Sequence, residues 1–178
     1  MTKPNINITP VTKDQLFKLR DLMETTFMEA FEHLNAPENI EIYKAQNLSK
    51  ENVLAEMENK NSSFYFVYFG DEPAGYLKLN IKEAQTDSLL DNALEIERIY
   101  LLNAFQGKGL GKALFAFAEG LAVKGGYSWL WLGVWEKNDK AIEFYTHHGL
   151  DGFATHDFLM GHERQTDILM KKAISAAS

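Results

Sequence analysis

A glycine-rich stretch carries the strongest chemical signal in the chain: Gln106-Gly107-Lys108-Gly109-Leu110-Gly111-Lys112. Glycine at every second position lets the backbone turn tightly and leaves its N–H groups without a side chain beside them. The stretch follows an apolar run typical of a strand, 93–101, and opens a run typical of a helix, 110–123. Unpaired N–H groups at a helix N-terminus, together with the helix dipole, attract phosphate. The sequence therefore predicts a diphosphate-binding loop at a strand-to-helix junction.

Spacing excludes two other glycine-rich phosphate-binding motifs. A P-loop requires G-x-x-x-x-G-K-[S/T], but Ala113 follows Gly111-Lys112 and Gln106 stands where the first glycine belongs. A dinucleotide fingerprint requires G-x-G-x-x-G, but here the third glycine comes one residue early. In addition, no acidic residue ends the next predicted strand, at 129–135. The pattern that remains is Q-x-x-G-x-G.

Composition limits the class of protein. The chain of 178 residues, 46% of them hydrophobic, is long enough for one domain with a substantial core. The absence of cysteine excludes disulfides, thiolate metal sites and a cysteine nucleophile. A net charge of −7 argues against nonspecific binding to nucleic acid or anionic membranes. The same charge suits a cationic substrate, although a solvated acidic surface is the commoner reason for it.

Neither a membrane span nor a signal peptide is indicated. No apolar run reaches the roughly 18 residues that a membrane span needs. Residues 1–5 contain no apolar signal-peptide core. These features predict a cytoplasmic protein.

Periodicity in the first half of the chain predicts a strand, helices and a hairpin. Thr12-Lys13-Asp14-Gln15 is a capping box for a helix whose apolar stripe begins at Leu16. Pro37 is expected to break that helix. The elements expected in order are a strand at 6–11, this first helix, a second helical region at 39–59 interrupted near 48–49, hairpin strands at 64–69 and 74–82, and a loop at 83–92.

The second half alternates between strand and helix patterns. Residues 129–132 are apolar on both faces, which predicts a central strand. A hairpin followed by this alternation predicts a mixed α/β sheet with helices on both faces, in one domain over residues 1–178. The elements expected in order are a strand at 93–101, a helix from 110, a strand at 129–135, a helix at 138–148 ended by Gly149, and strands at 153–159 and 168–171.

Four segments, in this order, resemble the GNAT family of N-acetyltransferases. They are the strand at 95–101, the Q-x-x-G-x-G loop, the strand at 129–135, and a segment at 138–150. The last is similar to the family's N-x-x-A-x-x-x-Y-x-x-x-G-F, with Leu150 in place of the usual Phe. The match is close over 94–150, while the first half fits only by the order of its elements. The resemblance implies a single-domain α/β GNAT fold, with a mixed, mostly antiparallel sheet, helices on both faces and a splayed central strand pair.

The resemblance also implies the reaction: transfer of acetyl from acetyl-CoA to a primary amine, directly and without a metal. In the family the pantetheine arm of the cosubstrate lies beside the strand ahead of the loop and bonds its main chain like an added strand. A backbone N–H there, that of Ile99, is expected to face the thioester oxygen. The implied cofactor-binding residues are Ile99, Tyr100, Leu101, Gln106, Gly107, Lys108, Gly109, Leu110, Gly111, Lys112, Asn138 and Tyr145.

Tyr145 is the predicted general acid. A tyrosine hydroxyl is protonated at neutral pH and can give its proton to a departing thiolate, and the resemblance places Tyr145 at the position that commonly does so. The alternative is a tyrosine that only packs within its helix. Asn138 is an N-cap candidate by residue type, and the resemblance adds a contact with the cofactor arm.

The general base is left open between two glutamates. Glu95 and Glu97 alternate onto one side of their strand, near the expected cleft, and Arg98 is expected on the opposite side in a structural role. A carboxylate with an ordinary pKa is a poor base for an ammonium group, so burial or a water relay is needed. Either glutamate could instead bind a cationic substrate, and the remaining alternative is that neither acts as the base.

The acceptor is predicted less specifically than the reaction. The strand at 95–101 and the tail at 158–170 look like the PaiA type of the family, which implies a polyamine such as spermidine. The alternatives are a protein N-terminus, a small amino acid, or a catalytically idle CoA-binding module. The first helices and last strands are expected to select the substrate, and the protein is expected to be a monomer or homodimer. The acidic residues expected to recognise positive charge are Glu29, Glu32, Asp157 and Glu163.

Three further features have structural and functional readings. Gly133 lies mid-strand and marks either a close approach that parts two strands for the cofactor or a simple bulge. The histidines do not form a ligand set, so no metal is expected. The tryptophans at 129, 131 and 135 share one strand face and are expected in the core.

Overall fold

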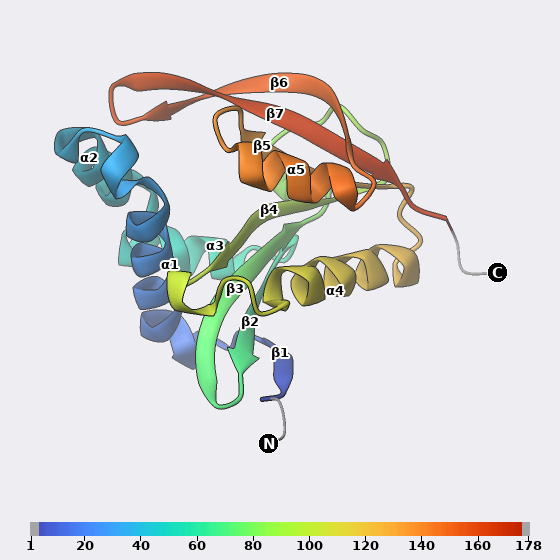
Figure 1. The fold of residues 1–178 in the computed structure, drawn as a ribbon, viewed down its shortest axis with the longest axis horizontal. Helices are drawn as coiled ribbons and strands as arrows, with labels where there is room; N and C mark the ends of the chain where they lie inside the picture. Colours follow the sequence, from blue (N-terminus) through green and yellow to red (C-terminus); the bar gives the residue numbers. More distant parts are fainter. Residues whose placement is uncertain (1–3, 176–178) are drawn as a thin grey trace.

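Seven strands form one sheet in the computed structural model, which describes residues 4–175 (Figure 1). Their order across the sheet is β1-β2-β3-β4-β5-β7-β6, and every neighbouring pair is antiparallel except β4 and β5. The strands are β1 (Ile6–Pro10), β2 (Ser62–Phe69), β3 (Glu72–Asn80), β4 (Ala93–Leu101), β5 (Trp129–Trp135), β6 (Asp151–Met160) and β7 (Glu163–Ala173). The helices are α1 (Leu16–Phe31), α2 (Pro37–Asn47), α3 (Lys50–Glu58), α4 (Leu110–Lys124) and α5 (Asp139–His147). The predicted fold class, including a mixed and mostly antiparallel sheet, is confirmed.

The elements of the second half lie close to their predicted bounds. β4 and β5 have the predicted bounds, and α4 begins at Leu110 as expected and ends at Lys124. The Asn138 side chain accepts a hydrogen bond of 3.2 Å from the N–H of Ala141, which confirms it as the N-cap of α5. Gly149 follows α5 with a φ of 94°, the left-handed conformation that ends many helices.

The first half differs from the prediction at Pro37. The capping box at Thr12 is present, but it opens a short 3-10 turn that leads into α1. α1 ends at Phe31, and Pro37 begins α2 instead of breaking α1. Proline suits the first position of a helix because that N–H has no helical partner in any case. The predicted interruption near 48–49 is confirmed, with Ser49 capping α3.

The last two strands are longer than predicted and form a hairpin. Residues 167–173 of β7 pair with the whole of β5, and β7 pairs with β6 on its other side. This pairing extends the ordered backbone beyond the apolar runs that were visible in the sequence. The hairpin turn at Gly161, with a φ of 64°, lies against Asn39 of α2. The His162 N–H donates to Asn39 Oδ1 at 2.9 Å. In Figure 1 the tip of this hairpin reaches α2.

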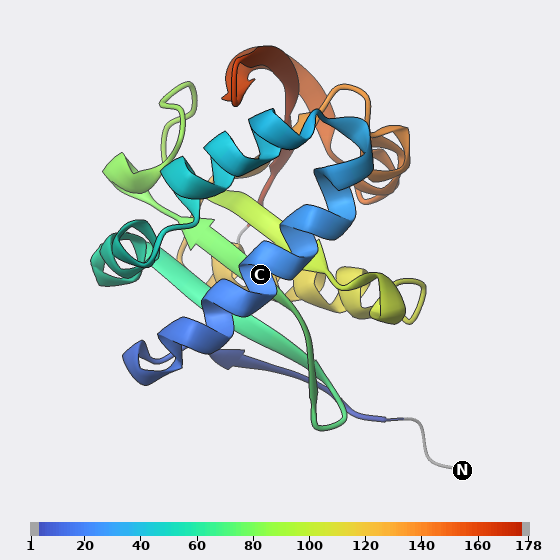
Figure 2. The ribbon, with the colours of Figure 1, turned by 90° about the vertical axis from the view of Figure 1, so that its left-hand side faces the viewer.

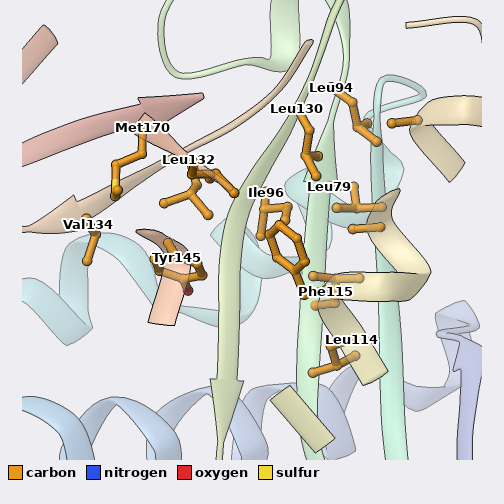
Figure 3. Close-up of a cluster of buried hydrophobic side chains, with 14 of the residues drawn as sticks. Leu79, Leu94, Ile96, Leu114, Phe115, Leu130, Leu132, Val134, Tyr145 and Met170 are labelled. Atoms are coloured by element: carbon orange, nitrogen blue, oxygen red, sulfur yellow. The ribbon is translucent and has the colours of Figure 1, made fainter. Parts of the chain in front are cut away.

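Helices cover both faces of the sheet. α4 and α5 pack on one face, where the largest apolar cluster includes Leu114, Phe115 and Tyr145 (Figure 3). α1 and α3 cover the other face over Phe64, Phe66 and Tyr76, and Figure 2 shows α1 crossing in front of the strands. α2 lies between α1 and β6, since Phe27, Ile40 and Met160 form a third cluster.

The parallel pair β4–β5 separates halfway along its length. Its register runs from Ala93↔Trp129 to Ile96↔Leu132 and ends there, although both strands continue. β4 also has a bulge, since Arg98 pairs with Lys78 of β3 whereas Ile96 pairs with Leu79, which leaves Glu97 as the extra residue. The splayed central strand pair expected from the sequence is therefore present.

Candidate active site

The glycine-rich loop presents open backbone at the N-terminus of α4. Gly107 and Gly109 have φ values of 76° and 87°, the left-handed region that favours glycine. A Cβ added at either position would meet nothing within 4 Å, so the space beside this backbone is free. The first helical bond runs from Ala113 N to Gly109 O at 3.1 Å, so the preceding N–H groups of the helix lack an acceptor one turn back. This geometry can hold an anion.

The free edge of β4 lies next to this loop. Leu102 N donates to Ala74 O at 2.8 Å, and N–H directions alternate along a strand. The main-chain groups of Ile99 and Leu101 therefore point away from β3, toward the side from which β5 has separated. Tyr100, which was grouped with them in the sequence analysis, points its main chain toward β3 and lines a cleft with its side chain. The free edge can accept an added extended chain.

A cleft of about 450 Å³ opens on the α1 side of the sheet, beside the separated strands. It is bounded by α1, α2, β4, the end of β5 and the β6–β7 hairpin, so the elements predicted to select the substrate do line it. Its ionisable side chains include Glu97, Arg98 and Asp167. The rest of its lining is largely aromatic and apolar: Met23, Phe27, Phe31, Tyr43, Tyr76, Tyr100, Trp135, Phe158 and Met160.

Arg98 lies in the same cleft as Glu97, so its predicted place on the opposite side of the strand is wrong. The bulge explains the difference, since an extra residue in the strand shifts the alternation of side chains. Arg98 makes two hydrogen bonds to the Glu56 carboxylate, of 2.8 and 3.0 Å. Lys78 Nζ lies 2.5 Å from Glu97 Oε2 and 3.3 Å from Glu56 Oε2. Two carboxylates and two cations thus form one largely buried, charge-balanced network.

Within this network the ionised states are mutually stabilised. Burial alone would raise the pKa of Glu56, but Arg98 and Lys78 lower it below its usual value. Burial alone would lower the pKa of Arg98, but the neighbouring groups, with Glu97 and Glu56 among them, raise it. Glu97 meets the cleft with its Oε2 atom 2.5 Å from Lys78 Nζ and 3.6 Å from Arg98 Nε.

Glu95 does not line the cleft. Its side chain is only 2% exposed, and it accepts hydrogen bonds from Asn80 Nδ2 at 3.0 Å and from the Thr86 N–H at 2.9 Å. The Thr86 hydroxyl donates to its second oxygen. Burial raises the pKa of Glu95, and these hydrogen bonds act against that rise. The hydrogen bonds from Asn80 and Thr86 to Glu95 hold the loop after β3 against β4, so Glu95 has a structural role.

Tyr145 lies on α5, inside the core on the α4 face (Figure 3). Its ring packs near those of Phe144 and Phe115, at centroid distances of 5.4 and 6.3 Å. Burial raises the pKa of Tyr145 above its usual value, so its hydroxyl is protonated throughout the physiological range. No hydrogen-bond partner of this hydroxyl is found in residues 4–175.

Gly133 makes room for another side chain. The register of β5 with β7 is unbroken from Trp129 to Trp135, so Gly133 is not a bulge. A Cβ at Gly133 would lie 3.2 Å from Asp167 Oδ2 and 3.3 Å from a methyl group of Leu169. Gly133 thus marks a close approach, and the approaching groups are side chains of β7. That Gly133 helps the strands part for the cofactor stays a prediction.

Asp167 is the cleft residue that the sequence analysis missed. Burial raises the pKa of its carboxyl to about 6, and His156 opposes that rise. Its signal in the sequence was its place two positions before Leu169, whose side chain shares its face of the strand. It was overlooked because β7 was expected to begin only at 168.

The raised pKa of Asp167 predicts a pH-dependent gain in stability for Asp167→Asn. The folded-state pKa of about 6 exceeds the ordinary aspartate pKa of 3.8, so the carboxylate lowers stability progressively as pH rises through that interval. At pH 8 the variant is expected to have a higher free energy of unfolding, by at most about 3 kcal/mol. At pH 3.5 the two proteins should be equally stable. Urea unfolding at both pH values tests this, with the exposed Asp151→Asn as control; equal or lower stability at pH 8 would contradict it.

The remaining predicted residues lie outside the cleft or have different surroundings. None of the four acidic residues expected to recognise positive charge lines the cleft. Glu29 accepts a hydrogen bond from the Asn103 N–H, and Asp157 pairs with Arg164. Of the tryptophans, Trp131 is buried and donates to Gln85 at 2.7 Å, whereas Trp135 lines the cleft. Within residues 4–175 no group of three or more candidate ligands is arranged to hold a metal, and no helix is long and apolar enough to cross a membrane.

Comparison with known proteins identifies the family. Residues 17–150 match the family model described as Acetyltransferase (GNAT) family. An uncharacterized N-acetyltransferase in the pepI 3' region of Lactobacillus delbrueckii subsp. lactis is 41% identical over 169 residues, covering 95% of this chain and 98% of that protein. The chain therefore belongs to the GNAT family, and it is an N-acetyltransferase.

Solved structures agree on the fold. The PaiA N-acetyltransferase from Thermoplasma acidophilum, determined in complex with coenzyme A, superimposes with a TM-score of 0.74 at 23% identity, covering 95% of this chain and 99% of that one. The ribosomal-protein-S18-alanine N-acetyltransferase from Escherichia coli has a TM-score of 0.70 at 17% identity, with coverage of 98% and 97%. At these identities the likeness establishes the fold, and the acceptor must be argued from this chain's own cleft.

Proposed function

We propose that the protein transfers acetyl from acetyl-CoA to a primary amine held in the cleft. The observation that carries this proposal is the separation of β4 from β5 after Ile96 and Leu132, next to the open amides that begin α4. A diphosphate at the helix end and an extended arm along the free edge of β4 would together direct a thioester toward the split. The cleft reaches the same split from the opposite face of the sheet.

The proposed cofactor-binding groups fit these two parts of coenzyme A. Backbone amides from Gly107 to Lys112 would hold the diphosphate, with the side chains of Lys108 and Lys112 adding positive charge. The main chain of Ile99 and Leu101 would hold the pantetheine arm, and the Ile99 N–H would face the thioester oxygen. Asn138 and Tyr145 complete the set from α5.

Tyr145 is the proposed acid for the departing thiolate. Its burial keeps the hydroxyl protonated, although the raised pKa also makes it a weaker proton donor. Glu97 is better placed than Glu95 to act on the acceptor, because Glu97 lines the cleft while both oxygens of Glu95 are occupied by hydrogen bonds. Because Glu97 is paired with Lys78, its proposed role is to set the electrostatic potential in the cleft.

A polyamine such as spermidine is the proposed acceptor. Aromatic rings such as Tyr43, Tyr100 and Trp135 can pack against its methylene chain and attract its ammonium groups. The net charge of −7 favours a cationic acceptor over a neutral or anionic one.

Release of free CoA, measured with a panel of amines, tests the function. The panel contains spermidine, spermine, small amino acids and peptides with free N-termini, and the highest kcat/KM is expected with a polyamine. A preference for peptides or amino acids would move the acceptor to the alternative classes. Binding of acetyl-CoA without turnover on any amine would show an idle CoA-binding module and overturn the proposal.

Gly109→Ala is expected to weaken coenzyme A binding without unfolding the protein. A side chain at a φ of 87° costs about 1–2 kcal/mol, and relief of that strain would rotate the amides out of position. Loss of one charge-assisted hydrogen bond corresponds to roughly a tenfold rise in Kd or more. Isothermal titration with coenzyme A measures the effect. Gly120→Ala, in the exposed middle of α4, is the matched control and should leave Kd unchanged; equal affinities for both variants would remove the loop from the site.

A further inference from the structure

The carboxylate of Asp167 lies where the central strands separate. In the sheet, Asp167 is paired with Trp135 of β5 on one side and with His156 of β6 on the other. Its Oδ2 atom is 3.2 Å from the point where a Cβ of Gly133 would stand. Gly133 is the first residue of β5 beyond the last pair with β4. The carboxylate therefore lines the cleft beside the opening between the strands.

Asp167 is also the cleft carboxylate that no cation among the described residues neutralises. Glu97, the other acidic residue that lines the cleft, is held by Lys78 at 2.5 Å. For the Asp167 side chain, no hydrogen bond or ion pair is found within the part of the chain that the structure describes, residues 4–175. A half-buried carboxylate without a partner is costly, and a cationic ligand would remove that cost.

The surroundings of Asp167 favour a positively charged ligand group that has lost its hydration water. Tyr43 stacks on Phe27 with ring centroids 4.6 Å apart, and both rings line the cleft. A positive group here would meet one free carboxylate and several aromatic rings.

We propose that Asp167 binds the ammonium group of the acceptor and takes its proton before the nitrogen attacks the acetyl group. This inference rests on the proposed function and adds to it the base that the sequence left open. It replaces Glu95 and Glu97 in that role, because both oxygens of Glu95 accept hydrogen bonds and Glu97 lies 2.5 Å from the cation of Lys78.

The proton balance of the step is complete. The ammonium gives one proton to Asp167, which becomes a neutral carboxylic acid, and the nitrogen lone pair forms the C–N bond to the acetyl carbon. The C–S bond then breaks, and the thiolate takes a proton from its acid. The second nitrogen proton restores that acid directly or through water. Asp167 returns its proton to solvent, so one ammonium and one thioester give one amide, one thiol and one proton.

The electrostatic setting supports a carboxylate in this role. A pKa of about 6 makes Asp167 a stronger base than an aspartate in water, although an ammonium group still needs partial desolvation to lose its proton to it. The titratable or charged groups that line this cleft or adjoin Asp167 are Tyr43 of α2, Tyr76 of β3, Glu97, Arg98 and Tyr100 of β4, and His156 of β6.

Kinetics of Asp167→Asn test the inference. At pH 8, with the best amine of the panel, kcat/KM is expected to fall on the order of 100-fold. In the unsubstituted enzyme kcat/KM should decline as pH falls below about 6, and this acidic limb should be absent from the variant. Coenzyme A should bind both proteins equally, which shows that the variant is folded and separates acceptor chemistry from cofactor binding. Asp151→Asn, exposed at the start of β6, is the matched control and should retain full activity.

Two results would overturn the inference, and they differ in what they say of the reaction. If Asp167→Asn keeps kcat/KM within about twofold, or keeps the acidic limb at the same pH, Asp167 is not the base while acetyl transfer stands. If the unsubstituted enzyme binds acetyl-CoA but acetylates no amine, the proposed function fails and the inference fails with it.

Discussion

Tyr145→Phe is expected to lower kcat by roughly 100- to 1,000-fold, the range typical of a lost general acid or base. The substitution removes one hydroxyl from a side chain that is 8% exposed and keeps the ring that packs among Phe115 and Phe144. Burial raises the pKa of Tyr145, so the hydroxyl carries a proton at every pH at which the enzyme is assayed. Without it, the thiolate must leave unprotonated or take its proton from water.

Several measurements separate this loss from a packing defect. The Kd for coenzyme A and the midpoint of thermal unfolding should be nearly unchanged, because the apolar contacts of the ring remain. Tyr127→Phe removes the hydroxyl of a partly buried tyrosine that packs against the same core cluster, and it should leave kcat at its normal value. If Tyr145→Phe and Tyr127→Phe have the same kcat, Tyr145 is only a packed helix residue.

The second half of the fold could be predicted from sequence because local and long-range signals agree there. Residues 129–132 are apolar on both faces, and a strand buries both faces only where other elements cover the two sides of the sheet, as at its centre. Asn138 and Gly149 mark the two ends of α5 by their own backbone chemistry. In such segments the tertiary structure reinforces what each residue favours locally.

The bulge in β4 could not be predicted from the sequence. It is also the feature that most alters which side chains line the cleft, compared with the prediction. A regular strand would place Glu97 and Arg98 on opposite faces, as the sequence analysis assumed. The extra residue at Glu97 arises from pairing with β3, which is set by contacts distant in sequence. The alternation of side chains along a regular strand therefore predicted β4 correctly but placed Arg98 on the wrong face of the sheet.

Asp167 was missed for a related reason. The sequence around it, Gln165-Thr166-Asp167, is polar and shows no strand signal of its own. Its strand conformation comes from pairing with β5 and β6 on both sides. The position of Gly133, opposite Leu169 in the register, was a usable signal, but its meaning depends on knowing which strand is adjacent.

Arg98→Ala is expected to destabilise the protein by about 3–5 kcal/mol at pH 7, the usual cost of removing one partner from a buried ion network. The Arg98 side chain is 15% exposed and makes two hydrogen bonds to Glu56. Its removal leaves Glu56 and Glu97 to share the single cation of Lys78. Urea unfolding at constant ionic strength measures the loss.

The effect should depend on pH in a direction that the network fixes. The pKa of Glu56 is lowered in the folded state, so its stabilising contribution is present above its usual range and is lost as pH falls. The difference between Arg98→Ala and the unsubstituted protein should therefore shrink at acidic pH. Arg164→Ala, which breaks an ion pair whose side chains are 76% and 52% exposed, is the matched control and should cost under about 1 kcal/mol. If Arg98→Ala lowered the free energy of unfolding as little as Arg164→Ala does, packing of the aromatic side chains, and not the ion network, would be what stabilises this part of the cleft.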